Sequence, residues 1–345
     1  MKGKFKFFAT LVAAGLMLSA HGALAQGTLN VLSVGGTVDK TIQKALEGFE
    51  QKYRVSIQWI PGSSGGNAAK VVATKDSPEY DIVMGEDISY HGLSARGLLA
   101  KLDPSIVTNY ENLLPQAQFA PQDGAMIGFN INGLFYDTEE FKKNNWAPPT
   151  SWNDLYKPEY CKRVGLMSPT VSYTLNFAVM EAGGDVDKVP EAISKKISKL
   201  RGCVPTLEPS AAKLEEKIQL REYVIGVYGS VRVLPLAEQG IPVRFVYPKE
   251  GTVRGSTTVA VVKGAPNQKA AQQFVNELLA PKAQELLMNL QYFVPANSKV
   301  EIPQKLIDQG LPTREQVIKA ISLDAGAVAD RRRDWGRLFE RELAP

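Results

Sequence analysis

A short apolar run, a turn containing glycine and an amphipathic helix follow one another repeatedly along this chain. The first unit has an apolar run at 29–34, the turn Gly35-Gly36-Thr37 and a helical pattern over 38–52. Residues 55–60 and 80–84 repeat the apolar run, and each is again followed by a glycine-containing turn and a helical pattern. This alternation is typical of βαβ units, which build a mostly parallel sheet covered by helices. We therefore predict an α/β fold.

A second set of such units begins near residue 133, with apolar runs at 164–167, 224–228, 243–247 and 258–262. Ser168 and Pro169 are suited to the N-cap and the first position of a helix, and Gly229-Ser230 opens another helical pattern. Ligands of open α/β sheets bind where strands end and helices begin, so these turns are candidate binding positions. The chain without its first 25 residues, about 320 residues, exceeds what one hydrophobic core usually supports, and two lobes are expected.

The first 25 residues have the pattern of a secretory signal peptide. Three lysines lie within the first six residues, 7–18 is apolar and uncharged, and Ala23-Leu24-Ala25 supplies small residues at the cleavage positions. The apolar run is shorter than the roughly 20 residues that span a membrane, although an uncleaved anchor is the alternative. We predict cleavage after Ala25, a mature chain that begins at Gln26, and export to the periplasm without a lipid anchor.

The charge of the chain gives no reason to expect a polyanionic partner. There are 40 Lys and Arg against 36 Asp and Glu, and three of the lysines lie in the predicted signal peptide. The mature chain is therefore nearly neutral, and no nucleic-acid partner is expected.

The chain has two cysteines, Cys161 and Cys203. In an oxidising compartment a pair within one lobe favours a disulfide, and two buried free thiols are the alternative. Closing a loop of about 42 residues would stabilise the fold by roughly 4 kcal/mol in the chain-entropy account. A metal site is not expected, because His91 is the single histidine after the signal peptide and no Cys-x-x-Cys spacing occurs.

Four segments resemble a known family: Tyr80-Asp81-Ile82-Val83, Pro149-Thr150-Ser151-Trp152-Asn153-Asp154-Leu155 with Lys157-Pro158-Glu159-Tyr160, Tyr247-Pro248-Lys249-Glu250-Gly251, and Asp334-Trp335. From about Leu29 to Glu342 the chain resembles the spermidine/putrescine-type periplasmic solute-binding proteins. Iron, thiamine, aminoethylphosphonate and γ-aminobutyrate receptors belong to the same class. The Pro-Thr-Ser-Trp segment is the most specific of these markers.

The resemblance implies a two-lobed, type II periplasmic binding protein. Lobe 1 would comprise 26–132 and 257–345, lobe 2 would comprise 133–256, and two crossing strands would form the hinge. Each lobe would hold a mixed, mostly parallel sheet with flanking helices. A small molecule would bind between the lobes, and the protein would deliver it to an inner-membrane ABC permease. The alternative is that the protein presents its bound ligand to a membrane sensor. We expect a monomer without a cofactor.

Polyamine receptors of this family hold ammonium groups with carboxylates and aromatic faces. Aligned on this chain, the family's acidic pair falls on Thr170 and Tyr173, a further acid falls on Thr257, and a tryptophan position carries Gly255. A desolvated cation without a partner is strongly disfavoured, so the missing acids argue against a polyamine. Glu86 and Asp87 remain as acids for the cleft.

Hydroxyl groups, glycines and arginines replace those acids, a set that suits a carboxylate or phosphonate. The candidate ligand-binding residues are Gly36, Thr37, Ser63, Ser64, Asp87, Thr170, Tyr173, Tyr228, Ser230, Arg232, Arg254 and Thr257. We predict an anionic or zwitterionic ligand, such as γ-aminobutyrate or a phosphonate, with Asp87 or Glu86 taking any ammonium end. The alternative is a polyamine held by these two acids and aromatic residues. Arg232 and Arg254 are each either ligand contacts or structural residues.

Other functions are less well supported by the residues. A triad enzyme would need a histidine, and His91 is the single candidate, so we do not expect an enzyme. Ferric receptors of this class use two adjacent tyrosines, and none of the 12 tyrosines here are adjacent. Arg331-Arg332-Arg333 is interpreted as a solvated helix face.

Overall fold

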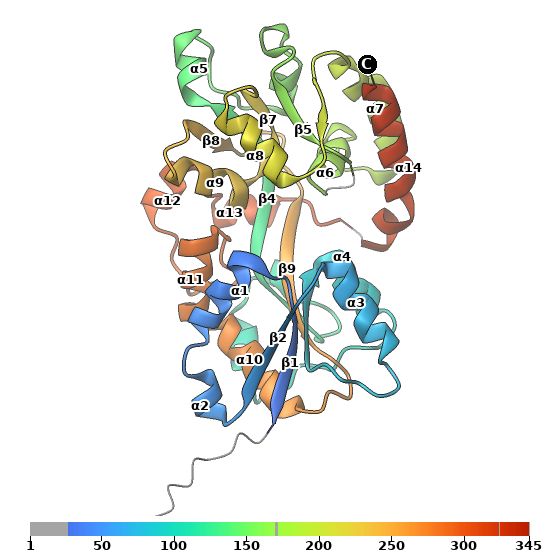
Figure 1. The fold of residues 1–345 in the computed structure, drawn as a ribbon, viewed down its shortest axis with the longest axis vertical. Coiled ribbons are helices and arrows are strands. Elements are labelled where there is room, and N and C mark those ends of the chain that lie inside the picture. The colour runs from blue at the N-terminus through green and yellow to red at the C-terminus, as the bar shows by residue number, and fades with distance from the viewer. Residues whose placement is uncertain (1–26, 170–171, 324, 345) are drawn as a thin grey trace, which may run out of the picture.

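The computed structural model describes residues 27–169, 172–323 and 325–344, which form two lobes joined by long strands (Figure 1). The predicted signal peptide, its cleavage site and Thr170 lie outside the described residues. Within the described part of the chain, no helix is long and apolar enough to cross a membrane.

Lobe 1 is built on strands in the order β2-β1-β3-β9-β4. β1 (Thr28–Ser33) is parallel to β2 (Ser56–Pro61) and β3 (Ile82–Glu86), whereas β9 (Arg254–Val261) is antiparallel to β3 and to β4 (Ala125–Asp137). The helices of this lobe are α1 (Gly36–Ala45), α2 (Phe49–Tyr53), α3 (Ser64–Ala73), α4 (Asp87–Ser94), α10 (Gln268–Leu279) and α11 (Pro281–Gln291), with the 3-10 turns η1 (Thr108–Asn112) and η2 (Pro115–Ala117).

The predicted helix over 38–52 is two helices. α1 ends at Ala45, and α2 starts at Phe49 after Gly48, whose φ of 83° lies in the left-handed region. An α-helix cannot continue through that backbone conformation, and glycine adopts it without steric cost.

Lobe 2 contains the second half of β4 and the strands β5 (Val164–Met167), β6 (Leu207–Glu208), β7 (Ile225–Gly229) and β8 (Val243–Val246). β7 and β8 pair antiparallel with β4, and β5 is parallel to both β6 and β7. The segments around these strands are α5 (Thr138–Lys143), α6 (Ser172–Glu181), α7 (Val189–Lys195), α8 (Ala211–Gln219), α9 (Ser230–Glu238), η3 (Trp152–Tyr156), η4 (Pro158–Tyr160), η5 (Val186–Lys188) and η6 (Ile197–Leu200).

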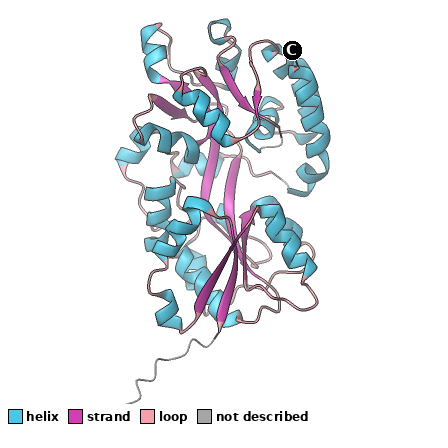
Figure 2. Ribbon diagram, in the orientation of Figure 1, coloured by secondary structure: helices cyan, strands magenta, loops and turns pink. Residues whose placement is uncertain are grey.

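Two strands pass from one lobe into the other, as Figure 2 shows. β4 has 13 residues, and at about 3.4 Å per residue it is long enough to belong to both sheets. It pairs with β9 over Ala125–Ile131 and with β7 over Asn132–Tyr136. Every antiparallel pair involves β4 or β9, and the other pairs of the sheet are parallel. The predicted two-lobed α/β fold with two crossing strands is confirmed.

The C-terminal helices are α12 (Gln304–Gln309), α13 (Arg314–Lys319) and α14 (Ala325–Leu343), and α14 packs on α6, α7 and η6 of lobe 2 and also on α4 of lobe 1. Arg244 Nη2 donates to the Asp308 carbonyl at 2.7 Å, and the Tyr247 hydroxyl donates to the Gln316 carbonyl at 3.1 Å. Trp335 belongs to the apolar cluster of lobe 2. The residue boundaries predicted for the lobes therefore stay a proposal, which we amend by placing the helices from Gln304 onward with lobe 2.

The two most distinctive family-like segments lie against each other in lobe 2. The Ser151 hydroxyl donates to the Glu250 carboxylate, and Trp152 Nε1 donates to the Gly251 carbonyl at 3.0 Å. Ser151 also forms a capping box with Asp154 at the start of η3. The Trp152 side chain is buried. These contacts hold the two segments together within lobe 2.

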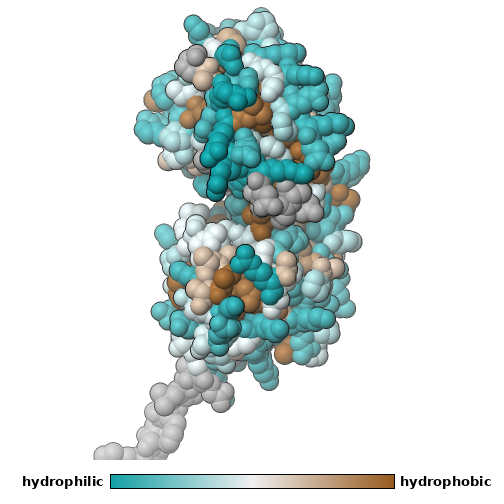
Figure 3. All heavy atoms as spheres, turned by 90° about the vertical axis from the view of Figure 1, so that its right-hand side faces the viewer, coloured by the Kyte–Doolittle hydropathy of each residue, from teal (hydrophilic) through white to brown (hydrophobic). Residues whose placement is uncertain are grey.

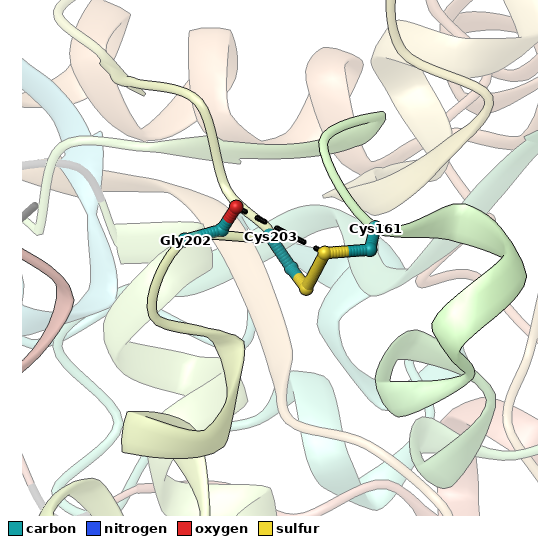
Figure 4. The surroundings of a disulfide bond; sticks show 3 residues. All are labelled: Cys161, Gly202 and Cys203. Carbon is teal, nitrogen blue, oxygen red and sulfur yellow. Dashed lines mark hydrogen bonds between the residues drawn. A yellow bond between two sulfur atoms is a disulfide. The ribbon is translucent and has the colours of Figure 1, made fainter.

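Cys161 and Cys203 form a disulfide, as predicted (Figure 4). The bond joins the residue after η4 to the loop after η6, across 42 positions of sequence. It closes a loop that contains β5, α6 and α7.

Candidate ligand-binding cleft

A hollow separates the two lobes in the space-filling view of Figure 3. β1 and β3 end where α1 and α4 begin, and β7 ends where α9 begins. The first N–H groups of a helix lack partners within the helix and carry positive partial charge. Glu86 at the end of β3 pairs with Thr257 of β9. The crossing strand β9 therefore lies beside the start of α4.

At the start of α1, the buried Asp39 satisfies the local donors. Its carboxylate accepts from the Ser33 hydroxyl at 2.5 Å and from the Gly35 N–H at 2.9 Å. The Thr37 hydroxyl donates to Gln291 Oε1 at 3.0 Å. Thr37 therefore ties α1 to α11, while Gly36 is exposed at the helix start.

The hydroxyls of Ser63 and Ser64 are used within lobe 1. Ser63 caps α3 by accepting from the Gly66 N–H at 3.2 Å. Ser64 Oγ accepts from the Glu86 N–H at 2.7 Å and donates to Ser89 Oγ at 2.8 Å. These bonds fix the start of α4 against the start of α3, which is a positioning role for both serines.

The two acids at the start of α4 differ in their surroundings. Glu86 is exposed and pairs across the strands with Thr257, so both side chains lie on one face of the sheet. Asp87 is half-buried, and burial raises the pKa of its carboxyl to about 6, against a smaller opposing effect of Arg254. Glu86 is the acid better placed to meet a ligand from solvent.

Arg254 and Thr257 point to opposite faces of β9. Arg254 pairs with Ile131 and Thr257 pairs with Gly128, with no bulge in the ladder between them. Side chains alternate along a strand, so two residues that are three positions apart point to opposite faces. The Arg254 guanidinium donates to the Ala320 carbonyl, and burial lowers its pKa, with Asp87 acting in the opposite sense. Within the described residues its Nε has no hydrogen-bond partner. Arg254 thus joins β9 to the segment before α14, on the face away from Thr257.

Two tyrosines and an arginine lie together in lobe 2. The Tyr173 and Tyr228 rings meet edge to face at 5.2 Å between centroids, and the Tyr228 hydroxyl donates to Glu215 Oε1 at 2.7 Å. The side chain of Arg232 is 51% exposed, and its Nη1 lies 3.8 Å from Glu215 Oε1. Ser230 is buried and accepts from the Ile131 N–H at 3.4 Å, which ties α9 to β4.

Tyr173 lies between charges from both lobes. Burial raises the pKa of its hydroxyl, the nearby positive charge of Arg232 lowers it, and the negative charge of Glu86 raises it further. Tyr173 also packs against both apolar clusters of the molecule. Arg232 of lobe 2 and Glu86 of lobe 1 therefore both act electrostatically on the Tyr173 hydroxyl.

Asn130 completes this group and is absent from the sequence-based set. It lies on β4 directly opposite Gly255, and its Nδ2 donates to the Tyr173 hydroxyl at 3.3 Å. Its sequence neighbours are mostly apolar, and no motif in the sequence distinguishes Asn130 as a binding residue. Only the register between β4 and β9 identifies it as a cleft residue.

Among the described residues, no group of three His, Cys, Asp or Glu side chains is arranged to hold a metal ion. Arg331, predicted to be solvated, pairs with Asp187 at 2.8 Å and links α14 to η5.

Comparison with known proteins identifies the family. The sequence model of the family described as bacterial extracellular solute-binding protein matches residues 44–311. The spermidine/putrescine-binding periplasmic protein of Escherichia coli is 23% identical over 329 residues, 90% of each chain. The γ-aminobutyric acid-binding protein of Pseudomonas aeruginosa is 24% identical over 323 residues, 89% of this chain and 88% of that one.

A solved structure shows the same fold. The spermidine/putrescine ABC transporter substrate-binding protein of Streptococcus pneumoniae superposes with a TM-score of 0.76 at 18% identity, covering 92% of this chain and 99% of that one. The family and these relatives are solute-binding transport receptors, which bind small molecules and deliver them to membrane permeases. Because the family match covers well over half of its 345 residues, this chain belongs to the bacterial extracellular solute-binding proteins.

Proposed function

We propose that the cleft binds a small zwitterion, an amino-acid-like carboxylate such as γ-aminobutyrate, for delivery to an ABC permease. The proposal is supported by the geometry around Tyr173, whose hydroxyl accepts from Asn130 of β4 at 3.3 Å and whose ring meets that of Tyr228. Tyr228 and the half-exposed Arg232 share the Glu215 carboxylate in lobe 2, and the negative charge of Glu86 acts on Tyr173 from lobe 1. A ligand between those charges would be anionic at one end and cationic at the other. The mature receptor would begin at Gln26 and act as a periplasmic monomer.

Arg232 is the proposed partner of the carboxylate. It lies in the first turn of α9, is half exposed, and is paired only loosely with Glu215. A guanidinium can bind a carboxylate through two parallel hydrogen bonds, and the N–H groups at the start of α9 favour the same charge. The Tyr173 hydroxyl, whose oxygen accepts from Asn130, can donate its proton to the same anion.

Glu86 is the proposed partner of the ammonium group. It is exposed, stands at the end of β3, and shares a sheet face with Thr257. Because the two charged partners belong to different lobes, a zwitterion would stabilise the closed arrangement more than the open one. A closed, liganded form is what a permease would distinguish from the empty receptor.

A polyamine is the second candidate. It is favoured by the relative from Escherichia coli, whose name is spermidine/putrescine-binding, and by the carboxylate of Glu215 beside the rings of Tyr173 and Tyr228. The relative named for γ-aminobutyric acid supports the zwitterion to a similar extent. The arginine at the cleft decides our preference, since a cation beside a diamine is repulsive.

A thermal-shift panel tests the ligand class. A ligand at 100 times its dissociation constant adds about 2.7 kcal/mol to the free energy of unfolding, which is easily measured. We expect γ-aminobutyrate or a related amino acid to raise the melting temperature and putrescine, spermidine and butyrate to leave it unchanged. Stabilisation by the diamines alone would reject the zwitterion.

The pair Arg232→Leu and Arg254→Leu tests the site itself. We expect Arg232→Leu to weaken binding of the stabilising ligand by about 10- to 100-fold, the loss of one charge-assisted contact. Arg254→Leu should instead lower the melting temperature of the empty protein and change affinity little, because Arg254 joins β9 to Ala320. Calorimetric titration and melting of both variants check this. Equal affinity for parent and Arg232→Leu would remove Arg232 from the site.

A further inference from the structure

On the face of the crossing strands that carries the Asn130 side chain, the neighbouring position on β9 is a glycine. On this face Asn130 of β4 stands opposite Gly255 of β9, and Thr257 follows two residues along. Among the described residues, a Cβ atom added at Gly255 would have only the backbone carbonyl oxygen of Asn130 within 4 Å, at 3.7 Å. Gly255 therefore leaves the position beside Asn130 without a side chain.

The Asn130 amide is held in place by lobe 2. Its Nδ2 donates to the Tyr173 hydroxyl, and Tyr173 rests on Gly229, where a Cβ atom would lie 2.7 Å from the tyrosine ring and 2.9 Å from Asn130 Oδ1. Only glycine at 229 lets the ring and the amide approach β7 this closely. The amide plane is thus fixed by groups that come from α6 and from β7.

One atom of this fixed amide has no partner. Asn130 Oδ1 is shielded from solvent and receives no hydrogen bond from any described residue, and the Nδ2 of the buried Asn132, two residues along the same face, is also unpartnered. Buried carbonyl oxygens in folded proteins are nearly always paired, so an unpaired one at a ligand cleft marks a position that a ligand donor completes. The free atom of Asn130 is an acceptor, and the acid whose negative charge acts on the same tyrosine is Glu86.

We propose that Asn130 determines specificity by accepting a hydrogen bond from the nitrogen-bearing end of the ligand through Oδ1. Glu86 supplies the charge for that ammonium group, and Asn130 supplies a neutral acceptor whose direction is set by Tyr173. The inference rests on the cleft being the ligand site. It does not rest on the ligand also having a carboxylate.

The test uses Asn130→Leu and Asn130→Asp in the mature, full-length protein, titrated calorimetrically with γ-aminobutyrate and with putrescine. Leucine has nearly the shape of asparagine and removes the acceptor, so whichever amine the parent binds should bind about 10-fold more weakly. Aspartate adds a second negative charge, and the ratio of putrescine affinity to γ-aminobutyrate affinity should rise by about 10-fold or more. If the parent binds putrescine alone, the zwitterion is rejected while the effect of Asn130→Leu still reports on this inference.

A second measurement needs no ligand. If Oδ1 serves the ligand, Asn130→Leu removes an unpaired buried acceptor and also loses the 3.3 Å bond to Tyr173, so the melting temperature of the empty variant should stay close to that of the parent. A fall of several degrees would assign Asn130 a structural role and overturn the proposal. Unchanged amine affinity in Asn130→Leu, or weaker binding of both probes to Asn130→Asp, would overturn it as well.

Discussion

Asp87 and Arg254 carry opposite charges that are both partly withdrawn from water, at a place where α4, β9 and the segment before α14 meet. Burial disfavours the charged form of each group, and their mutual attraction offsets only part of that effect. Burying such groups is seldom stabilising in itself. Their value lies in fixing the crossing strand to elements of both lobes.

Stability should therefore depend on pH through Asp87. Its pKa rises from 3.8 to about 6 on folding, so the folded state holds the proton more tightly, and this contribution is lost as pH increases from about 4 to 6. A shift of this size corresponds to at most about 3 kcal/mol. We expect the melting temperature of Asp87→Asn minus that of the parent to increase as the pH rises from 4 to 8.

Asp76→Asn, which removes an exposed carboxylate from the same lobe, is the control for loss of one negative charge. Melting curves of the three proteins across this pH range provide the measurement. A difference between Asp87→Asn and the parent that does not change with pH would mean that Asp87 is not buried as described.

The crossing strands show how an element determines a site. β9 presents Gly255 and Thr257 to one face and Arg254 and Ser256 to the other, because side chains alternate along a strand. A slip of one residue against β4 would exchange the two sets. The register that pairs Glu86 with Thr257 therefore decides which polar groups meet the ligand.

The contact between η3 and the loop at Glu250 is formed within lobe 2, and we expect it to serve stability rather than binding. Glu250 accepts from the Ser151 hydroxyl and from the Trp152 N–H at 3.3 Å. We expect Glu250→Ala to lower the free energy of unfolding by about 1–2 kcal/mol, because it leaves these donors unpaired. Ligand affinity should stay within twofold of the parent.

Glu159→Ala is the matched control, since Glu159 is an exposed glutamate in the same lobe. Denaturant unfolding and titration of the two variants separate stability from binding. A large loss of affinity in Glu250→Ala would show that the segment shapes the cleft after all.

Three kinds of long-range connection hold the described part of the molecule: the crossing strands, the packing of α14 on helices of both lobes, and the disulfide. The disulfide encloses β5, α6 and α7, and α6 carries Tyr173 into the cleft. It acts chiefly on the unfolded chain, whose freedom it restricts, so it should stabilise lobe 2 without altering the site.

Replacing both cysteines with alanine should lower the free energy of unfolding by up to about 4 kcal/mol. Adding a reductant should lower the melting temperature of the parent and leave that of the double variant unchanged. Affinity for the ligand, measured well below the melting temperature, should be the same in both proteins. A parent that melts at the same temperature with and without reductant would contradict the prediction.

Local patterns in the sequence determined the elements, the family and the disulfide. Alternating apolar runs and glycine turns specify strands and helices over a few residues, and two cysteines in an oxidising compartment leave little choice of partner. Even there, Gly48 divides one predicted helix into two, since a periodic pattern does not reveal a left-handed backbone.

The tertiary structure alone decided which residues face the cleft. Arg254 and Thr257 are close in sequence and were predicted together, but the pairing of β9 with β3 and β4 sends them to opposite faces. Asn130 has no motif, and it becomes a candidate only because Gly255 lies opposite and Tyr173 fixes its amide. The packing of α14 against helices of both lobes was likewise not predicted. Each of these depends on contacts between segments far apart in the chain, and short-range sequence patterns contain no record of such contacts.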